Sequence, residues 1–167
     1  LVAALAFLLV VGELYVIGAG FFPRTDPALV EYPLPCIEFL HHDADGPFRI
    51  TTYVGGDKTL NANAGWMYGL QDIRGYDSII PRQYVEYMEL IQPQTELMYN
   101  RIAPIYEVFG DVLDSPLLHM LNVRYVLANR EQPIRREGYS LVYDGDILIY
   151  RNENALPRAF LVPRAVT

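Results

Sequence analysis

The apolar N-terminal stretch, residues 1–22, constrains this chain more than any other feature of its sequence. Glu13 is the only charged residue in it, and most of the other positions are Leu, Val, Ala, Phe or Ile. About 20 apolar residues in a helix cross the hydrocarbon core of a bilayer, so this stretch is long enough to span a membrane. Pro23 ends the run. We therefore predict a transmembrane helix over residues 1–22.

Two other interpretations of residues 1–22 remain open. A signal peptide would end at the small residues 18–20, and it would need a basic segment ahead of its apolar core. A buried core helix would have to be apolar on all sides within a small domain. An acidic side chain is unfavourable inside a bilayer, so we place Glu13 near the membrane interface or against a neighbouring helix.

The remaining residues have the composition of an acidic soluble domain that follows a short linker. The chain has 20 acidic and 13 basic residues, so it lacks the basic surplus that neutralises phosphates, and we expect no nucleic-acid partner. Its apolar share of 51% argues against disorder. Prolines are frequent in residues 23–35, which predicts an extended linker. Residues 36–167 then form the domain.

Periodicity and turn residues predict an α+β domain in this region. Asp144 and Gly145 stand between two alternating runs, which is typical of a hairpin with a two-residue turn. The order of elements favours a mainly antiparallel sheet with short helices. Residues 55–75 form a long loop, and such loops are usually functional or bound to a partner. We expect helices over 37–42, 81–91 and 117–121, and strands over 48–54, 123–127, 139–143, 146–150 and 160–162.

No motif in the sequence identifies an active site by its spacing. Residues 41–46 hold two His and two Asp, but a calcium loop starting at Asp43 would need an acidic residue where Val54 stands. We interpret this segment as a solvated turn. Cys36 is the single cysteine and has no basic neighbour, so it is an inert thiol, and His119 belongs to the polar face of a short helix. The sequence predicts no catalytic residue, no metal and no cofactor.

Arginines are the remaining candidates for binding. Their forked guanidinium groups suit an anionic sugar or a lipid phosphate. Scattered surface charge explains the same residues equally well. They are Arg124, Arg135, Arg136, Arg151, Arg158 and Arg164.

Three further segments carry motifs that are informative through their order and spacing along the chain. They are Gly69–Asp77 with Pro81–Tyr84, then Ser115–Leu127, and then Tyr150–Phe160. Together they resemble the C-terminal soluble region of the YfhO-like family of large bacterial membrane proteins. The apolar N-terminal stretch falls where that family has a membrane span leading into the soluble region.

The resemblance implies a multi-pass protein of the bacterial cell membrane with an extracytoplasmic soluble part. Some members are membrane glycosyltransferases of the C type, which move a sugar from a polyprenyl-phosphate donor to a cell-envelope polymer such as teichoic acid. Their catalytic acidic residue lies in an early extracytoplasmic loop, so none is assigned here. The family's soluble part continues into a further β-rich portion, which implies that the domain over 36–167 is incomplete at its C-terminus. The bilayer and the parent membrane domain are the implied partners.

Within the first of these segments, five side chains are candidates for substrate binding in a cleft that faces the membrane domain. Tyrosine would stack on sugar rings and arginine would bind phosphate, although all of these residues can equally serve packing. The resulting hypothesis is a non-catalytic domain that binds or positions a polyprenyl-phosphate sugar or an envelope glycopolymer. The alternatives are an envelope-assembly domain that binds a protein, and a secreted single domain. The five candidates are Asp72, Arg74, Tyr76, Asp77 and Arg82.

Overall fold

The computed structural model describes residues 1–21, 25–29, 32, 34–56 and 59–162. The chain divides into two compact units, Leu1–Pro33 and Leu34–Thr167. Within the predicted linker, η1 forms a short 3₁₀ helix over Pro27–Leu29, and residues 23–24, 30–31 and 33 lie outside the described residues.

The first unit contains helix α1, which covers Val2–Ala19. The helix has 18 residues and a mean hydropathy of 2.3, and none of its residues is buried. Among the described residues it is the one helix long and apolar enough to cross a membrane, and a signal sequence has the same properties.

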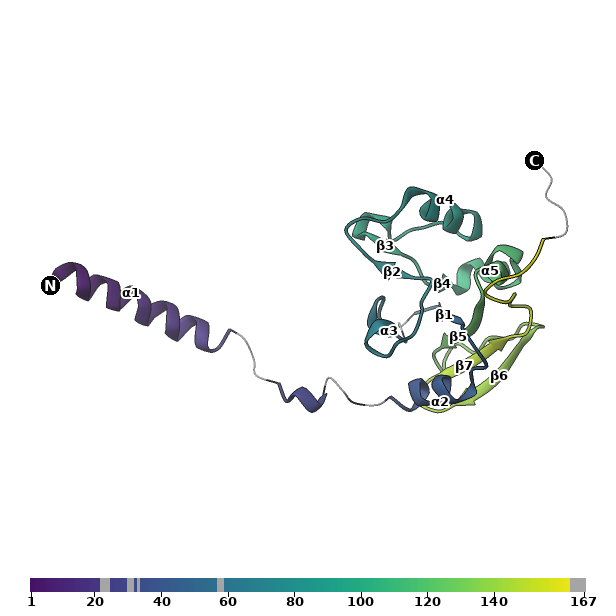
Figure 1. The fold of residues 1–167 in the computed structure, drawn as a ribbon, viewed down its shortest axis with the longest axis horizontal. Helices are drawn as coiled ribbons and strands as arrows, with labels where there is room; N and C mark the ends of the chain where they lie inside the picture. Colours follow the sequence, from purple (N-terminus) through teal and green to yellow (C-terminus); the bar gives the residue numbers. More distant parts are fainter. Residues whose placement is uncertain (22–24, 30–31, 33, 57–58, 163–167) are drawn as a thin grey trace. The chain divides into compact units, whose positions relative to one another are not determined.

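The second unit is built around a five-stranded sheet with the strand order β4-β1-β5-β7-β6 (Figure 1). Strand β1 pairs in parallel with both β4 and β5, whereas β7 pairs in antiparallel fashion with β5 and β6. The strands are β1 (Arg49–Val54), β4 (Ile105–Tyr106), β5 (Val123–Ala128), β6 (Tyr139–Asp144) and β7 (Leu148–Asn152).

This topology confirms the α+β class and corrects the expectation of a mainly antiparallel sheet. The sheet is mixed, because the chain between β1 and β5 crosses over through helices and returns in the same direction. Nearly every residue of β1 and β5 is buried, as is typical of parallel strands covered on both faces. Their strand-forming residues were recognisable in the sequence, but the direction of pairing depends on the crossover.

Helices cover the two faces of the sheet and create two hydrophobic clusters (Figure 1). Leu40 of α2 packs with Tyr125 and Leu127 on one face, and Met88 of α4 packs with Val126 on the other. The side chains of β5 thus alternate between the two clusters, as a strand requires. The three helices of these layers are α2 (Pro35–Asp43), α4 (Arg82–Ile91) and α5 (Pro116–Met120).

Two local expectations near the C-terminus are wrong. The predicted hairpin exists, but Asp144 pairs with Leu148, so its loop is one residue longer than a two-residue turn. Neither Asp144 nor Gly145 has the positive φ that the expected turn needs. The Tyr143 hydroxyl donates to Asp146 Oδ1 at 2.7 Å and holds the longer loop. Residues 160–162 form no strand, and their side chains are exposed.

Candidate functional site

A pocket with a volume of about 510 Å³ lies beside a two-stranded ribbon in the second unit. The ribbon consists of β2 (Gly75–Tyr76) and β3 (Arg101–Ile102), which pair in antiparallel fashion. The pocket also borders the short helix α3 (Ala64–Met67) and the segment that leads into α4. Residues from five separate parts of the chain line it, among them Arg49, Asn63, Trp66, Asp72, Tyr76, Ile79 and Tyr84.

Four of the five predicted binding residues lie in the pocket lining. These are Asp72, Arg74, Tyr76 and Asp77. Arg82 is not among the lining residues: its side chain is 88% exposed, and its Nε donates to Glu86 Oε1 at 2.7 Å on the surface of α4. The structure therefore places four of the five candidates at one pocket and Arg82 outside it.

Asp72 and Arg74 form an ion pair whose two side chains are 3% and 2% exposed. Arg74 Nη2 donates to Asp72 Oδ2 at 2.6 Å, and Arg74 Nη1 donates to the Leu60 carbonyl at 2.9 Å. The Arg74 backbone N–H also donates to Asp72 Oδ1 at 2.8 Å. Because these bonds use both charged groups, the pair forms part of the pocket wall. We expect the other lining residues to contact a ligand.

Tyr76 is held through its backbone, and about half of its surface is exposed. Asn63 Nδ2 donates to the Tyr76 carbonyl at 2.6 Å, and the Tyr76 N–H donates to Asn63 Oδ1 at 3.0 Å. Asn63 has a φ of 70°, a left-handed conformation that asparagine tolerates better than most residues. The Tyr76 side chain is 53% exposed, and the Arg101 guanidinium lies 5.6 Å from its ring centroid.

Arg49, Trp66 and Ile79 are among the lining residues that sequence reasoning missed. Trp66 and Ile79 are 79% and 83% exposed, unusually high values for large apolar side chains beside a pocket. Trp66 is the only tryptophan of the chain and lies in the long loop that was expected to be functional. That position was a usable signal for Trp66, whereas Arg49 reaches the pocket from β1, which no local pattern indicates.

Arg49 supplies a positive charge to the pocket wall. Its Nη1 donates to the Leu121 carbonyl at 2.9 Å. Burial lowers the pKa of Arg49, and the nearby charge of Arg158 lowers it further. The Tyr84 hydroxyl donates to the Ile73 carbonyl, and burial raises the pKa of Tyr84 to about 12. The pocket therefore combines aromatic faces with the Arg49 cation, the paired Asp72 and Arg74, the Asp77 carboxylate and the neutral phenol of Tyr84.

The segment 41–46 does more than form the solvated turn that the sequence suggested. Asp43 Oδ2 accepts hydrogen bonds from the Tyr125 hydroxyl at 2.7 Å and from Arg151 Nη2 at 2.5 Å. The bond from Arg151 lowers the pKa of Asp43, and burial raises the pKa of Tyr125 to about 12. Arg124 Nη1 donates to the Asp45 carbonyl at 2.9 Å. These contacts tie the end of α2 to the sheet.

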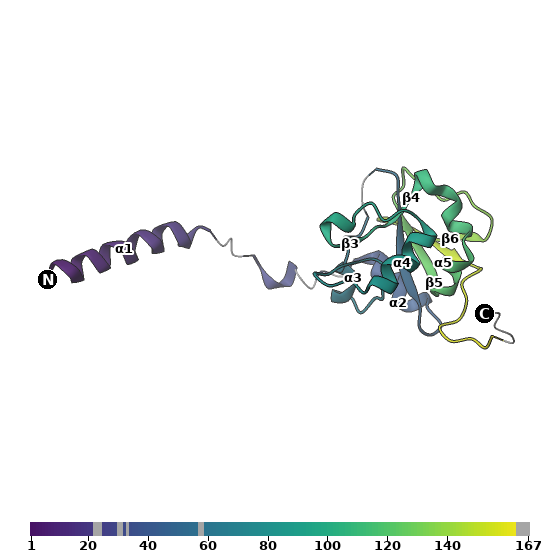
Figure 2. The same cartoon turned by 90° about the horizontal axis from the view of Figure 1, so that it is seen from above.

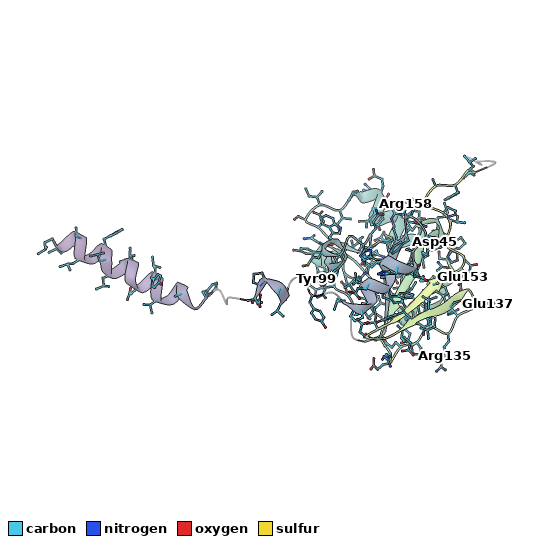
Figure 3. The ribbon with its side chains drawn as sticks, turned by 60° about the horizontal axis from the view of Figure 1, so that its bottom comes forward. Asp45, Tyr99, Arg135, Glu137, Glu153 and Arg158 are labelled. Carbon is cyan, nitrogen blue, oxygen red and sulfur yellow. The ribbon has the colours of Figure 1, made fainter. Side chains whose placement is uncertain are left out.

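The candidate arginines do not gather at one anion site. Arg124 and Arg151 hold the end of α2, and Arg136 pairs with Asp111 and Asp114 at 3.0 Å each. Surface charge is thus the better interpretation of these three. Arg158 lies close enough to Arg49 to lower its pKa, and Arg135 lies at the surface apart from it (Figure 3). Arg164 lies outside the described residues.

The remaining polar candidates of the sequence are embedded in the fold. Cys36 is 4% exposed, and burial together with Asp146 raises its pKa to about 12, so the thiolate is strongly disfavoured. His119 Nδ1 lies 3.1 Å from Asn152 Nδ2, and burial lowers the pKa of His119. Over the described ranges, no three His, Cys, Asp or Glu side chains are grouped so that they could hold a metal ion.

Comparisons with known proteins give no match for this chain, whether with family models, with curated proteins or with solved structures. The resemblance to the YfhO-like family consequently depends on the sequence segments alone. The features of the chain that bear on its function are the pocket, its exposed aromatic side chains and the apolar helix α1.

Proposed function

We propose that the second unit is a non-catalytic binding domain of a multi-pass bacterial membrane protein, and that its pocket takes the sugar part of a cell-envelope ligand. The parent protein is, on this proposal, a glycosyltransferase that moves sugar from a polyprenyl-phosphate donor to an envelope polymer. The domain lies on the extracytoplasmic side and positions donor or acceptor. Chemistry takes place in the parent membrane domain.

The observation that carries the proposal is the exposure of Trp66 and Tyr76 at the edge of the pocket, at 79% and 53%. Binding pockets are mainly apolar with a few placed polar groups, and this lining has that composition. Aromatic rings offer a flat apolar face for the C–H surface of a sugar, while their polar ends remain in water. Arg49 and Asn63 add hydrogen-bond donors for hydroxyl or phosphate oxygens.

The membrane part of the proposal is supported by α1, whose length and hydropathy suit a bilayer span. The segments that resemble the YfhO-like family include the stretch from Gly69 to Tyr84, and most of the pocket lining comes from this stretch. The resemblance and the pocket thus point to the same part of the domain.

A non-enzymatic envelope-assembly domain that binds a protein is the second candidate. Exposed apolar side chains around the pocket favour it, because large exposed patches often mark interaction surfaces. The two candidates differ in what saturates the pocket: a sugar-bearing polymer in the first and a polypeptide in the second.

Fluorescence of the single tryptophan tests the proposal directly. The full chain in detergent micelles is titrated with polyglycerol phosphate that carries sugar substituents, and separately with the sugar-free polymer. We expect a saturable change of Trp66 emission with the substituted polymer only. Tyr76→Ala should weaken binding at least tenfold, which corresponds to about 1.4 kcal/mol, because it removes a stacking face.

Arg82→Ala is the matched control, because Arg82 is exposed on α4 and does not line the pocket. It should leave both the fold and the titration unchanged. Equal responses to the two polymers would contradict sugar recognition. A titration that is unaffected by Tyr76→Ala would contradict binding in this pocket.

A further inference from the structure

Five large apolar or aromatic side chains with more than half of their surface exposed belong to three segments near the β2–β3 ribbon. Their exposed fractions are 79% for Trp66, 62% for Met67, 83% for Ile79, 78% for Met98 and 58% for Tyr99. Trp66 and Met67 belong to α3, and Met98 and Tyr99 belong to the 3₁₀ helix η2 (Leu97–Tyr99). Ile79 lies between β2 and α4. We call these five side chains the apolar rim.

Hydrogen bonds hold the three segments of the apolar rim together. Asn63, next to α3, bonds both backbone groups of Tyr76 in β2. The Asp77 N–H donates to the Asn100 carbonyl at 3.1 Å, which joins the segment before Ile79 to the residue after Tyr99. Both cartoon views show α3 and β3 on the same side of this unit, away from β6 (Figures 1 and 2). The three segments that carry the rim are therefore adjacent.

Charge is distributed differently around the unit. Tyr99 of the rim lies on the opposite side of the unit from Glu137 and Glu153 (Figure 3). Within the three segments, Asp77 accepts from the Ile79 N–H at 3.1 Å, and Arg101 lies over the Tyr76 ring. The rim thus combines apolar side chains with Trp and Tyr, has the exposed Asp77 beside Ile79, and lies away from Glu137 and Glu153. That combination suits the boundary between lipid headgroups and acyl chains.

We propose that the apolar rim rests on the surface of the same bilayer that α1 crosses. This inference rests on the membrane part of the proposed function. Segment 20–33 joins the two units, and when fully extended it reaches at most about 50 Å, so a membrane-anchored chain keeps the rim within reach of the lipid surface. Exposed Met and Ile side chains then enter the acyl region, while Trp66 and Tyr99 occupy the headgroup level.

Contact with lipid gives the pocket a defined orientation. Trp66 and Ile79 belong both to the rim and to the pocket lining, so the pocket opens at the lipid surface. A ligand that is itself a lipid, with its polar head near the membrane surface, enters without crossing water. The rim therefore selects membrane-borne ligands over the same headgroup free in solution.

The single tryptophan also tests this inference. The full chain is reconstituted in phosphatidylcholine vesicles, and in matched vesicles whose phosphatidylcholine is brominated in the acyl chains. Bromine quenches a nearby indole, and Trp66 is the only tryptophan. We expect at least a twofold lower emission in the brominated vesicles. Equal emission in the two lipids overturns the inference.

Charge substitutions on the rim sharpen the test. Ile79→Glu and Met98→Glu should restore most of the emission in brominated vesicles, because a carboxylate disfavours entry into the acyl region. Val108→Glu is the matched control, since Val108 is 80% exposed and lines a different pocket. It should leave quenching unchanged, and circular dichroism checks that all three variants fold. Quenching that survives both rim substitutions overturns the inference.

Other outcomes separate this inference from the proposed function. Loss of the polymer titration in micelles, with bromine quenching intact, contradicts the sugar pocket and leaves the rim in place. Emission that depends on protein density in the vesicles and not on bromine identifies a second copy as the occupant, which overturns lipid contact. Release of the chain by alkaline carbonate shows that α1 is no anchor and overturns the inference as well.

Discussion

The five-stranded sheet and the β2–β3 ribbon of the same unit are stabilised in different ways. The central strands β1 and β5 bury apolar side chains in clusters on both faces. The ribbon has two residues in each strand, and its Tyr76 and Arg101 are exposed. A two-stranded ribbon of this size is marginal in water by itself. Ile102 of β3, 2% exposed, packs in one of these clusters, and the rest of the ribbon depends on other contacts.

Polar side chains provide those contacts. The buried pair of Asp72 and Arg74 fixes the chain just before β2, and Asn63 bonds Tyr76. After the ribbon, Gln94 Oε1 accepts from the Ala103 N–H at 3.0 Å, and Gln92, 2% exposed, donates to the Pro104 carbonyl. Because polar groups hold the backbone, the aromatic rings are left for a ligand. In the core region, apolar side chains are buried and stabilise the fold. In the ribbon, the Tyr76 ring is exposed and can contact a ligand.

The largest effect is expected where the ribbon's polar support is broken. Arg74→Met leaves the Asp72 carboxylate buried without its partner, and loss of one member of such a pair lowers the free energy of unfolding by about 3–5 kcal/mol. Urea unfolding of the full chain in micelles measures it. Adding Asp72→Asn to Arg74→Met should recover part of the loss. A single variant as stable as the wild type would contradict polar support of the ribbon.

A cavity in the sheet should have an effect of about 3 kcal/mol on unfolding. Leu127→Ala removes a side chain with 0% exposure from the cluster beneath α2. Below the unfolding transition, polymer binding that depends on Tyr76 should stay unchanged, because no residue of β2 or β3 belongs to this cluster. Ala64 and Tyr68 beside Trp66 do pack against the cluster, so the emission of the ligand-free variant is the baseline of the titration. Leu141→Ala on β6, where the side chain is 49% exposed, is the control and should be nearly neutral. Weaker binding by folded Leu127→Ala protein would contradict independence of the two regions.

The same contrast explains how much of the fold was predictable. Local patterns identified α2, α4, α5, β1, β5 and the C-terminal hairpin, because apolar periodicity and turn residues act over short distances. The parallel pairing of β1 with β5 escaped prediction, since a crossover of the whole intervening chain determines it. Strand β4 also escaped prediction, because it has two residues that are defined by their pairing with β1. The longer hairpin loop follows from a bond of Tyr143 to Asp146.

The pocket was predictable only where one segment builds it. Residues between Gly69 and Tyr84 were singled out, and Asp72, Tyr76 and Asp77 do line the pocket. Arg49 and Leu121 come from β1 and the end of α5, so only the tertiary structure brings them there. Arg82 is exposed on α4 and does not line the pocket, and the sequence spacing did not reveal this.

Removal of the two hydrogen bonds between Asn63 and Tyr76 should affect stability less than the two preceding changes and should act mainly on binding. Asn63→Ala loses two hydrogen bonds to Tyr76 and forces alanine into a φ of 70°. Asn63→Gly loses the same bonds without the backbone strain. Each hydrogen bond contributes about 1 kcal/mol, so both variants should weaken polymer binding, and alanine should also lower the free energy of unfolding more than glycine. Unchanged binding by Asn63→Gly would show that the hydrogen bonds of Asn63 do not position Tyr76.

The smallest effect concerns the link between α2 and the sheet, and it depends on pH. The hydrogen bond from Arg151 lowers the pKa of Asp43 below its ordinary value of 3.8. Because the folded pKa lies below the unfolded one, the pair stabilises the fold at neutral pH, and this contribution is lost as the pH falls through the folded pKa. Partly exposed ion pairs contribute about 1 kcal/mol or less.

The difference in free energy of unfolding between the wild type and Asp43→Asn should therefore be largest at neutral pH and shrink in acid. Arg151→Met should reduce the same acid-sensitive component, because it removes the group that lowers the pKa of Asp43. Neither variant should alter polymer binding, since neither residue lines the pocket. A pH-independent difference would mean that Asp43 acts through its bond to Tyr125 alone, and the sheet region would then hold α2 without help from charge.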